Sequence, residues 1–314
     1  MKIGVVGTFN RDRIFPWQGA ESDSIGGIFF TVSYLASLFD AEVELCPVCY
    51  VGGDFAVELK EQLSAHANVR LDGLHPTAQS HVQVKLIYNS PQDRDEITTP
   101  LMPTLQWHHL QSLVDSDVVL VNLISGADVE LAALQRLKQV SNTLVYMDFH
   151  YVATGVDGNG KRFWQQPENW REWIDAVDVL QLNEVEARTV AGLPEDAPLD
   201  ALLRFGSSTL ELNPTVCHIT MGDRGSYLFF SGRGETHQQH FPAVPVPHIV
   251  DVTGCGDAFA TGFLLEYLAT ENVIAATRFA NQVAALNATF MGSTAIATVP
   301  QLLRQGLGYG TPTY

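Results

Sequence analysis

Residues 250–268, with the sequence VDVTGCGDAFATGFLLEYL, constrain the fold of this chain more than any other stretch. They are typical of a strand end, a tight turn at Gly254 and Gly256, and a helix that opens at about residue 256. Glycine permits backbone angles that most residues avoid, and it lets a ligand approach the main chain closely. Apolar residues then recur at helical spacing, at Phe259, Phe263, Leu264, Tyr267 and Leu268. One face of the helix should therefore be buried, and its unpaired N-terminal amides should favour an anion such as a phosphate.

Asp257 lies in the first turn of this predicted helix, where a carboxylate has two interpretations. It can cap the helix or balance its dipole, which is the more common role of an isolated acid. Beside an anion site it can instead be a general base, taking a proton from a hydroxyl that attacks the bound phosphate. The glycine on each side of Cys255 favours the second interpretation, so we predict a catalytic Asp257.

The run from Asp251 to Asp257, D-V-T-G-C-G-D, resembles the D-T-G-A-G-D signature of the ribokinase (PfkB) family of sugar and nucleoside kinases. Cys255 stands where the family usually has alanine. The resemblance implies that Asp257 is the catalytic base. It also implies that the backbone amides at Gly254, Cys255 and Gly256 form the anion hole for the transferring phosphoryl group.

Composition argues against several classes of partner. The chain of 314 residues has 18 basic and 35 acidic side chains and a net charge of −17, so long-range attraction to nucleic acid or an anionic membrane is not expected. No apolar run approaches the roughly 20 residues of a membrane helix, and the N-terminus lacks a basic region and a cleavage site, so we expect a cytoplasmic protein. Cys46 and Cys49 form a lone C-P-V-C in an apolar segment, which predicts a buried strand and no zinc site.

Apolar strands alternate with helical patterns along the chain. Residues 117–124, 129–137 and 143–150 have the order strand, helix, strand, and residues 2–8 form an apolar run typical of a first buried strand. This rhythm predicts an α/β fold with a doubly wound, mostly parallel sheet whose ligands lie at the carboxyl ends of the strands. We expect a single domain over residues 1–314.

Two segments predict a smaller sheet. Residues 80–88 alternate in polarity and residues 94–99 follow a polar turn, which indicates a β-hairpin. Residues 10–24 read as a loop or a peripheral pair of strands. The family resemblance implies that these parts, about 12–24 and 77–101, form a β-sheet lid over the substrate and a homodimer contact.

The substrate side is predicted mainly from the resemblance. Asp12 closes a G-x-x-x-x-D run after the first strand, where the family has an acid that binds substrate hydroxyls; a solvated loop acid is the alternative. Gly26 and Gly27 precede a predicted helix over residues 29–39, as in the family's G-G signature. The family often has asparagine where this chain has Thr31, which we assign to the acceptor site.

The residues predicted to bind ATP belong to motifs that are less specific than the D-V-T-G-C-G-D run. Asn183 and Glu186 match the family's N-x-x-E, which implies Mg²⁺ held through water, and they also fit a helix cap; the two roles are compatible. The segment from Thr220 to Gly225 resembles a T-x-G-x-x-G nucleotide motif, although such turns into hairpins are common. The residues assigned to ATP are Asn183, Glu186, Thr220, Gly222, Arg224, Gly225 and Asn281. Arg224 is equally consistent with a solvent-facing side chain, and Asn281 with an ordinary buried helix.

The hypothesis is an ATP-dependent kinase that phosphorylates an alcohol of a sugar or sugar-like molecule, with Asp257 as its base. Nucleoside, inositol and vitamin-alcohol acceptors stay open, as does a monovalent cation such as K⁺ beside the Asp251 turn. The alternative is a non-catalytic nucleotide- or sugar-binding regulatory protein on the same fold. The changed positions Thr31 and His150 motivate it: the segment D-F-H-Y, from Asp148 through His150, lacks the asparagine and arginine of the family's D-x-N-x-R.

Overall fold

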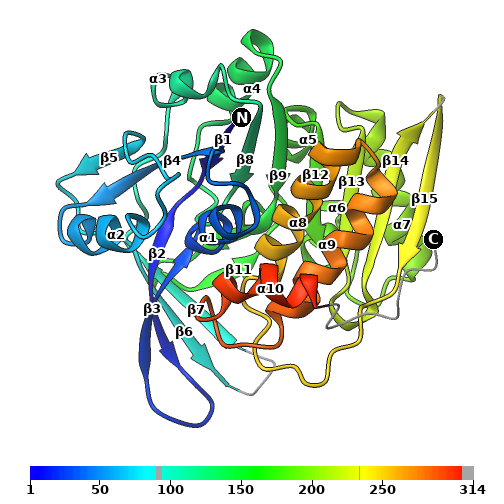
Figure 1. Ribbon diagram of the computed structural model, residues 1–314. Helices are drawn as coiled ribbons and strands as arrows, with labels where there is room; N and C mark the ends of the chain where they lie inside the picture. The colour runs from blue at the N-terminus through cyan, green and yellow to red at the C-terminus, as the bar shows by residue number, and fades with distance from the viewer. Residues whose placement is uncertain (90–93, 233, 306–314) are drawn as a thin grey trace.

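The computed structural model describes residues 1–89, 94–232 and 234–305, and nine strands of this part form the main sheet (Figure 1). Seven of them pair in parallel, in the order β13-β12-β9-β8-β1-β4-β5, and β14 and β15 extend the sheet through antiparallel pairs. The bounds are β1 (Lys2–Val6), β4 (Glu44–Gly52), β5 (Leu74–Thr77), β8 (Val118–Asn122), β9 (Leu144–Asp148), β12 (Val179–Asn183), β13 (Val216–Thr220), β14 (Ser226–Gly232) and β15 (Glu235–Phe241). The predicted doubly wound, mostly parallel sheet is therefore confirmed.

Helices cover both faces of this sheet (Figure 1). On one face lie α1 (Phe29–Leu38), α2 (Ala56–Leu63), α8 (Cys255–Thr270) and α9 (Val273–Asn287), with α10 (Val299–Arg304) packed against α1 and α9. On the other lie α3 (Trp107–Leu110), α4 (Leu131–Val140), α5 (Trp170–Asp175), α6 (Glu184–Ala191) and α7 (Leu199–Ser208). Short 3₁₀ helices are η1 (Gln111–Leu113), η2 (His150–Ala153), η3 (Thr209–Glu211), η4 (Gly222–Arg224) and η5 (Ile296–Thr298).

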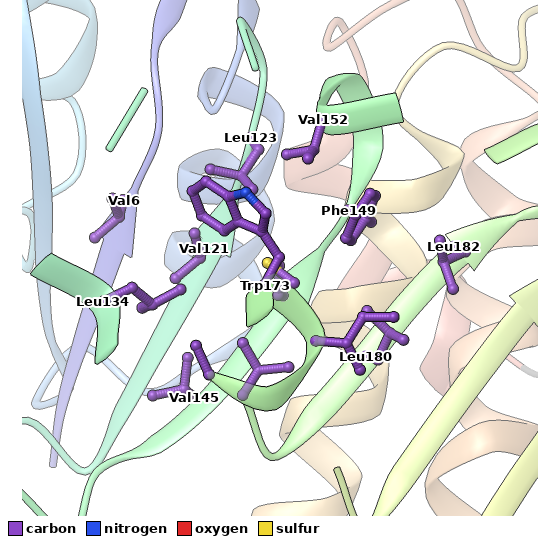
Figure 2. Packing of buried hydrophobic residues seen from close by; sticks show 14 of the residues in the cluster. Val6, Val121, Leu123, Leu134, Val145, Phe149, Val152, Trp173, Leu180 and Leu182 are labelled. Carbon is purple, nitrogen blue, oxygen red and sulfur yellow. The ribbon is translucent and has the colours of Figure 1, made fainter. Parts of the chain in front are cut away.

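The apolar runs of the strands explain why the sheet is interior. All five residues of β8 are buried, as expected for a parallel strand covered on both faces. Figure 2 shows the core on the second face, where Trp173 of α5 packs among strand side chains such as Val121 and Leu180. This packing fixes the strand ends, and the strand ends position the site.

The register of the strands brings polar residues together at their carboxyl ends. Asn122 on β8 pairs with Asp148 on β9, and Asp148 pairs with Gln181 on β12. Asn183 at the end of β12 pairs with Thr220 at the end of β13. Residues far apart in the sequence therefore form one polar edge, the place where open α/β sheets bind ligands.

A second sheet of four strands has the order β3-β2-β6-β7. Its strands are β2 (Phe9–Phe15), β3 (Ser22–Gly27), β6 (Gln83–Tyr88) and β7 (Arg94–Thr99), and the predicted hairpin is the antiparallel pair of β6 and β7. The expected lid segments, 12–24 and 77–101, overlap the four strands of this small sheet; Thr77 belongs to β5 of the main sheet, and residues 90–93 lie outside the described residues. A two-stranded hairpin, β10 (Thr154–Val156) and β11 (Arg162–Trp164), adjoins β7 through a bridge between Ile97 and Lys161. Within the ranges described, no helix has the length and hydrophobicity to cross a bilayer.

Candidate active site

The N-terminus of α8 opens on the polar edge of the main sheet. Gly254, the N-cap residue, has a left-handed φ of 82° and, as a glycine, brings no side chain to cap the helix start. A Cβ on Gly254 would lie 2.5 Å from the ring of Phe30, so only glycine fits this close approach. The amide of Cys255 donates to the carbonyl of Val252 at 3.2 Å, so this amide is used within the turn. Of the three amides predicted for the anion hole, those of Gly254 and Gly256 therefore remain.

The Asp257 carboxylate is held by two elements distant in the sequence. The hydroxyl of Thr31 on α1 donates to Oδ1, and the side-chain amide of Asn122 on β8 donates to the same oxygen at 2.9 Å. Within the described part of the chain, no hydrogen bond from another residue ends on Oδ2. The carboxylate is thus oriented through one oxygen and leaves the other for a further partner.

Burial raises the pKa of Asp257 to about 6. The hydrogen bond from Thr31, the positive charge of His150 and the hydrogen bond from Asn122 act in the opposite direction and limit the rise. A carboxylate with a pKa of about 6 is mostly ionised at neutral pH and more basic than an exposed aspartate, which suits a general base.

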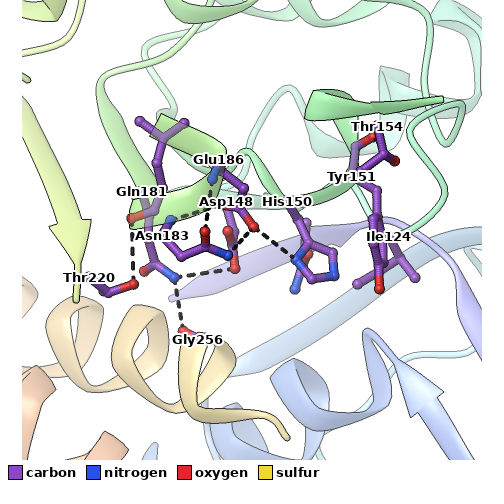
Figure 3. A network of polar contacts seen from close by, with 12 residues as sticks. Ile124, Asp148, His150, Tyr151, Thr154, Gln181, Asn183, Glu186, Thr220 and Gly256 are labelled. Carbon is purple, nitrogen blue, oxygen red and sulfur yellow. Dashed lines mark hydrogen bonds and ion pairs between the residues drawn. The ribbon is translucent and has the colours of Figure 1, made fainter. Parts of the chain in front are cut away.

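Gln181 ties the start of α8 to the strand ends (Figure 3). Its side-chain amide donates to Asp148 Oδ2 at 3.2 Å and to the carbonyl of Gly256 at 3.1 Å, and its oxygen accepts from the hydroxyl of Tyr146 at 2.6 Å. Burial raises the pKa of Asp148, and the neighbouring charge of Glu186 raises it further. The helix N-terminus therefore has a fixed position relative to β9 and β12.

Asn183 and Glu186 form a capping box at the start of α6. The amide of Glu186 donates to Asn183 Oδ1 at 2.9 Å, and Glu186 accepts from the Asn183 backbone at 2.8 Å and from its side chain at 2.5 Å. The capping role is confirmed. No group of three His, Cys, Asp or Glu residues in the described ranges is placed to hold a metal. Two oxygen-bearing residues at a strand end nevertheless suit Mg²⁺, because this ion keeps most of its water shell.

His150 follows β9 and faces Glu186 (Figure 3). Its Nδ1 lies 3.6 Å from Glu186 Oε1, and its backbone has a φ of 38°, which is uncommon for a residue with a side chain. Burial disfavours the charged ring, but the close Glu186 carboxylate and the charges of Asp148 and Asp257 raise the pKa of His150 to about 9. His150 thus lies near three carboxyl groups whose negative charges favour the protonated form of its ring.

A pocket of about 260 Å³ adjoins the N-terminus of α8, where Cys255 and Gly256 are part of its lining. Its walls are mostly small or apolar, from α8, α9 and the segment after β15. Among the residues predicted for the nucleotide, Thr220, Gly222, Gly225 and Asn281 line it, as does Cys255. Arg224 does not; it pairs with Glu184 on α6. The Asn281 amide donates to Ser226 Oγ at 2.8 Å and to the Thr277 carbonyl at 2.9 Å, so its nitrogen is used structurally.

The residues predicted for the acceptor lie at the junction of the small sheet and α1. Asp12 is buried beside Gly26, where any side chain would collide with its carboxylate, and Gly27 has a φ of 62°. Thr31 is fully buried and its hydroxyl contacts Asp257. Thr31 therefore orients the carboxylate and has no surface open to an acceptor, in contrast to its predicted role.

Three residues of the site were not predicted: Asn122, Gln181 and His150. Asn122 and Gln181 are polar residues near the ends of apolar strands, which is a signal that the sequence contains. Their partners depend on the register between parallel strands, and no local pattern reveals that register. His150 was noted only as a departure from the family's pattern.

Known proteins resemble this chain in sequence. A sequence profile described as "pfkB family carbohydrate kinase" matches residues 31–300. A cytidine kinase of Thermococcus kodakarensis is 26% identical over 281 residues, which cover 85% of this chain and 88% of that protein. A ribokinase of Arabidopsis thaliana is 29% identical over 129 residues, and the match spans 41% of this chain and about a third (32%) of that protein.

Solved structures share the fold at low sequence identity. Arabidopsis thaliana ribokinase complexed with ribose and ATP has a TM-score of 0.74 and 19% identity, and the match covers 96% of this chain and 98% of that one. A pyrophosphate-dependent kinase in the ribokinase family has a TM-score of 0.75 and 14% identity over 93% and 96% of the two chains.

Proposed function

This chain belongs to the pfkB family of carbohydrate kinases, and on that premise we propose that it transfers the γ-phosphoryl group of ATP to a hydroxyl of a sugar or sugar-like acceptor. One observation carries the proposal. Asp257 lies at the uncapped N-terminus of α8, oriented through Oδ1 by Thr31 and Asn122, with a pocket of about 260 Å³ beside the same turn. A base, an anion site and a donor pocket therefore meet at one point.

Asp257 acts as the general base. Oδ2 accepts the proton of the acceptor hydroxyl as the hydroxyl oxygen forms a bond to the γ-phosphorus. The bond from this phosphorus to the β–γ bridging oxygen breaks, and ADP leaves on the opposite side. Thr31 and Asn122 hold the carboxylate during this step, because both bonds end on Oδ1. Such preorientation is how a side chain keeps a near-attack geometry.

The start of α8 stabilises the negative charge on the transferring group. The amides of Gly254, Gly256 and Asp257 and the positive end of the helix dipole act together at this point. Gln181 keeps the turn in place through the Gly256 carbonyl. Asn183 and Glu186 would hold Mg²⁺ through water, and the ion would supply positive charge to offset that of the ATP phosphates. A monovalent cation such as K⁺ beside the Asp251 turn is a further expectation.

The pocket favours a nucleotide over inorganic pyrophosphate as the donor. Its lining includes Ala284 and Ala285 on α9, Ala288 just after that helix, and Val246 and Ile249, which form an apolar wall suited to a flat base. The small residues leave the space that a base requires. This wall is the reason to expect ATP here, although one structural neighbour is a pyrophosphate-dependent kinase.

Asp12 and the small sheet define the acceptor side. Asp12 binds acceptor hydroxyls, and Gly26 is the residue that leaves room for the Asp12 carboxylate. The small sheet acts as a lid that excludes water, which would otherwise compete as acceptor. Its outer side is the place of the expected homodimer contact. The relatives include a ribokinase, a cytidine kinase and a fructokinase, so the acceptor class extends from sugars to nucleosides.

The test is phosphoryl transfer from Mg-ATP and, separately, from pyrophosphate to a panel of sugars, nucleosides, inositols and vitamin alcohols. We expect ADP release with ATP and one group of related acceptors, and phosphorylated product by mass spectrometry. Turnover with pyrophosphate alone would reject the donor assignment. If ATP binds in calorimetry but no acceptor is phosphorylated, the result favours the non-catalytic alternative.

The raised pKa of Asp257 predicts that the pH profile of kcat/KM has an acid limb, that is, a fall in activity at low pH. A base must be ionised to act, so activity should fall as the pH drops below the pKa, which burial raises to about 6. We expect kcat/KM for the acceptor to fall about tenfold per pH unit below about pH 6 and to be level above about pH 7. Initial rates across this range, with ATP saturating, measure the limb.

Thr31→Val should shift this limb to higher pH, because the lost hydrogen bond is one of the interactions that lowers the pKa of Asp257. Thr270→Val is the matched control, since its hydroxyl bonds to the Glu266 carbonyl at the far end of α8. An identical limb in wild type and Thr31→Val would contradict the assignment of the titrating group to Asp257.

A further inference from the structure

Two consecutive acid–base pairs connect β7 of the small sheet with β11. Asp95 and Lys161 lie 2.7 Å apart with side chains 38% and 52% exposed, whereas Glu96 and Arg162 lie 4.0 Å apart with side chains 12% and 6% exposed. Successive residues of a strand point to opposite faces, so one pair faces outward and the other inward. The two strands also meet at the Ile97–Lys161 bridge.

The buried pair of Glu96 and Arg162, here called the inner pair, has several further contacts. The hydroxyl of Tyr151 donates to Glu96, and the Arg162 guanidinium lies 3.9 Å from the centre of the Tyr151 ring. Arg162 also donates to the carbonyls of Ile124 and Ser125, each at 3.4 Å, in the turn that follows β8. The cluster of Glu96, Tyr151 and Arg162, here called the inner cluster, thus joins the small sheet to the strand ends of the main sheet.

Tyr151 is also the neighbour of His150 (Figure 3). Their ring centres are 4.1 Å apart, and both belong to η2, the short turn after β9. The Tyr151 amide donates to the Leu123 carbonyl at 3.1 Å, and His150 Nδ1 faces Glu186 at 3.6 Å. A continuous set of contacts therefore runs from the small sheet through Tyr151 and His150 to Glu186.

We propose that Glu96, Tyr151 and Arg162 are positioning residues that couple the placement of the small sheet to the placement of His150 and Glu186. The part of Glu186 in holding Mg²⁺ rests on the proposed kinase function, but the mechanical coupling between the small sheet and residues 150 and 186 does not. A buried charge whose partner is removed is strongly disfavoured, so Arg162 must shift if Glu96 moves away. A residue with φ of 38° such as His150 keeps its conformation only when its surroundings determine it, so η2 should follow that shift.

The structure supplies a matched pair of variants, Glu96→Gln and Asp95→Asn. Each removes one carboxylate charge from β7, at adjacent positions, from the inner and the outer pair. Hydrogen–deuterium exchange on the ligand-free protein should show amides of β7 and of residues 149–153 exchanging at least about fivefold faster in Glu96→Gln, with β8 and β12 unchanged. In Asp95→Asn the same amides should stay within about twofold of wild type, as expected for an exposed pair. Faster exchange in β7 without any change at residues 149–153 would overturn the coupling.

Steady-state kinetics test whether the inner cluster positions the site or only stabilises the fold. Tyr151→Phe keeps the ring beside Arg162 and removes only the hydroxyl that donates to Glu96. We expect Tyr151→Phe and Glu96→Gln to raise both the acceptor KM and the fraction of ATP lost to water by at least about fivefold, with Asp95→Asn within about twofold. Equal values in all three variants and wild type would reject the positioning role. A wild type with no phosphoryl transfer would count against the proposed function alone, because the exchange experiment needs no substrate.

Discussion

Asp257→Asn is expected to lower kcat by about 10²–10⁴ while ATP binding stays close to wild type, because a general base contributes in this range. Asparagine has nearly the shape of aspartate, and its oxygen can still accept the hydrogen bonds from Thr31 and Asn122. The change therefore removes proton acceptance and leaves the orientation. Single-turnover rates with saturating Mg-ATP and the preferred acceptor measure the effect directly.

The variant should also fold at least as stably as wild type above about pH 6. Burial raises the pKa of Asp257, so its ionised form is disfavoured in the folded state, and a neutral side chain avoids that cost. Glu266→Gln on the same helix, remote from the N-terminal turn, is the control for loss of one negative charge and should retain full activity. Activity of Asp257→Asn within about threefold of wild type would reject the base assignment.

Much of the main fold could be predicted because its signals are local. The apolar runs at residues 117–124 and 143–150 and the helical spacing after residue 255 each depend on burial of one segment. The observed elements match them as β8, β9 and α8, with ends that differ by a few residues. The hairpin over residues 80–99 was also visible, since alternation around a polar turn is a short-range pattern.

The candidate site was predictable only where one segment contains both partners. Asn183 and Glu186 are three residues apart, so their capping box follows from the sequence, as does the position of Asp257 at a helix start. Thr31 and Asn122 bind Asp257 from 226 and 135 residues away, and no local pattern indicates such a pairing.

The inner cluster could not be predicted for the same reason. Glu96 and Arg162 belong to separate hairpins, and each reads as an ordinary strand charge until β7 and β11 meet. Asp95 and Lys161 look equivalent in the sequence, yet their pair is exposed. Burial decides which of the two pairs has consequences for the site, and burial follows from the tertiary structure.

Gly254→Ala is expected to displace the amides of the turn and so to reduce kcat/KM for ATP by about 10²–10³, the range seen when one donor of an anion hole no longer acts. Alanine has to adopt the φ of 82° that Gly254 adopts, which costs about 1–2 kcal/mol. Its Cβ would also lie 2.5 Å from the ring of Phe30, so the ring has to move. Thr31, the next residue of α1, then shifts with it and weakens the hydrogen bond to Asp257.

A rescue variant and a control distinguish the clash with Phe30 from the backbone strain at residue 254. Gly254→Ala combined with Phe30→Leu removes the clash but keeps the backbone strain, so it should recover part of the lost activity. Gly192→Ala tests backbone strain alone, because Gly192 has a φ of 65° at the end of α6 and its nearest neighbour would be 3.5 Å away. We expect Gly192→Ala to lower the melting temperature and leave kcat/KM for ATP within about threefold of wild type. Equal losses of kcat/KM in Gly192→Ala and Gly254→Ala would show that the turn at Gly254 has no special part in phosphate binding.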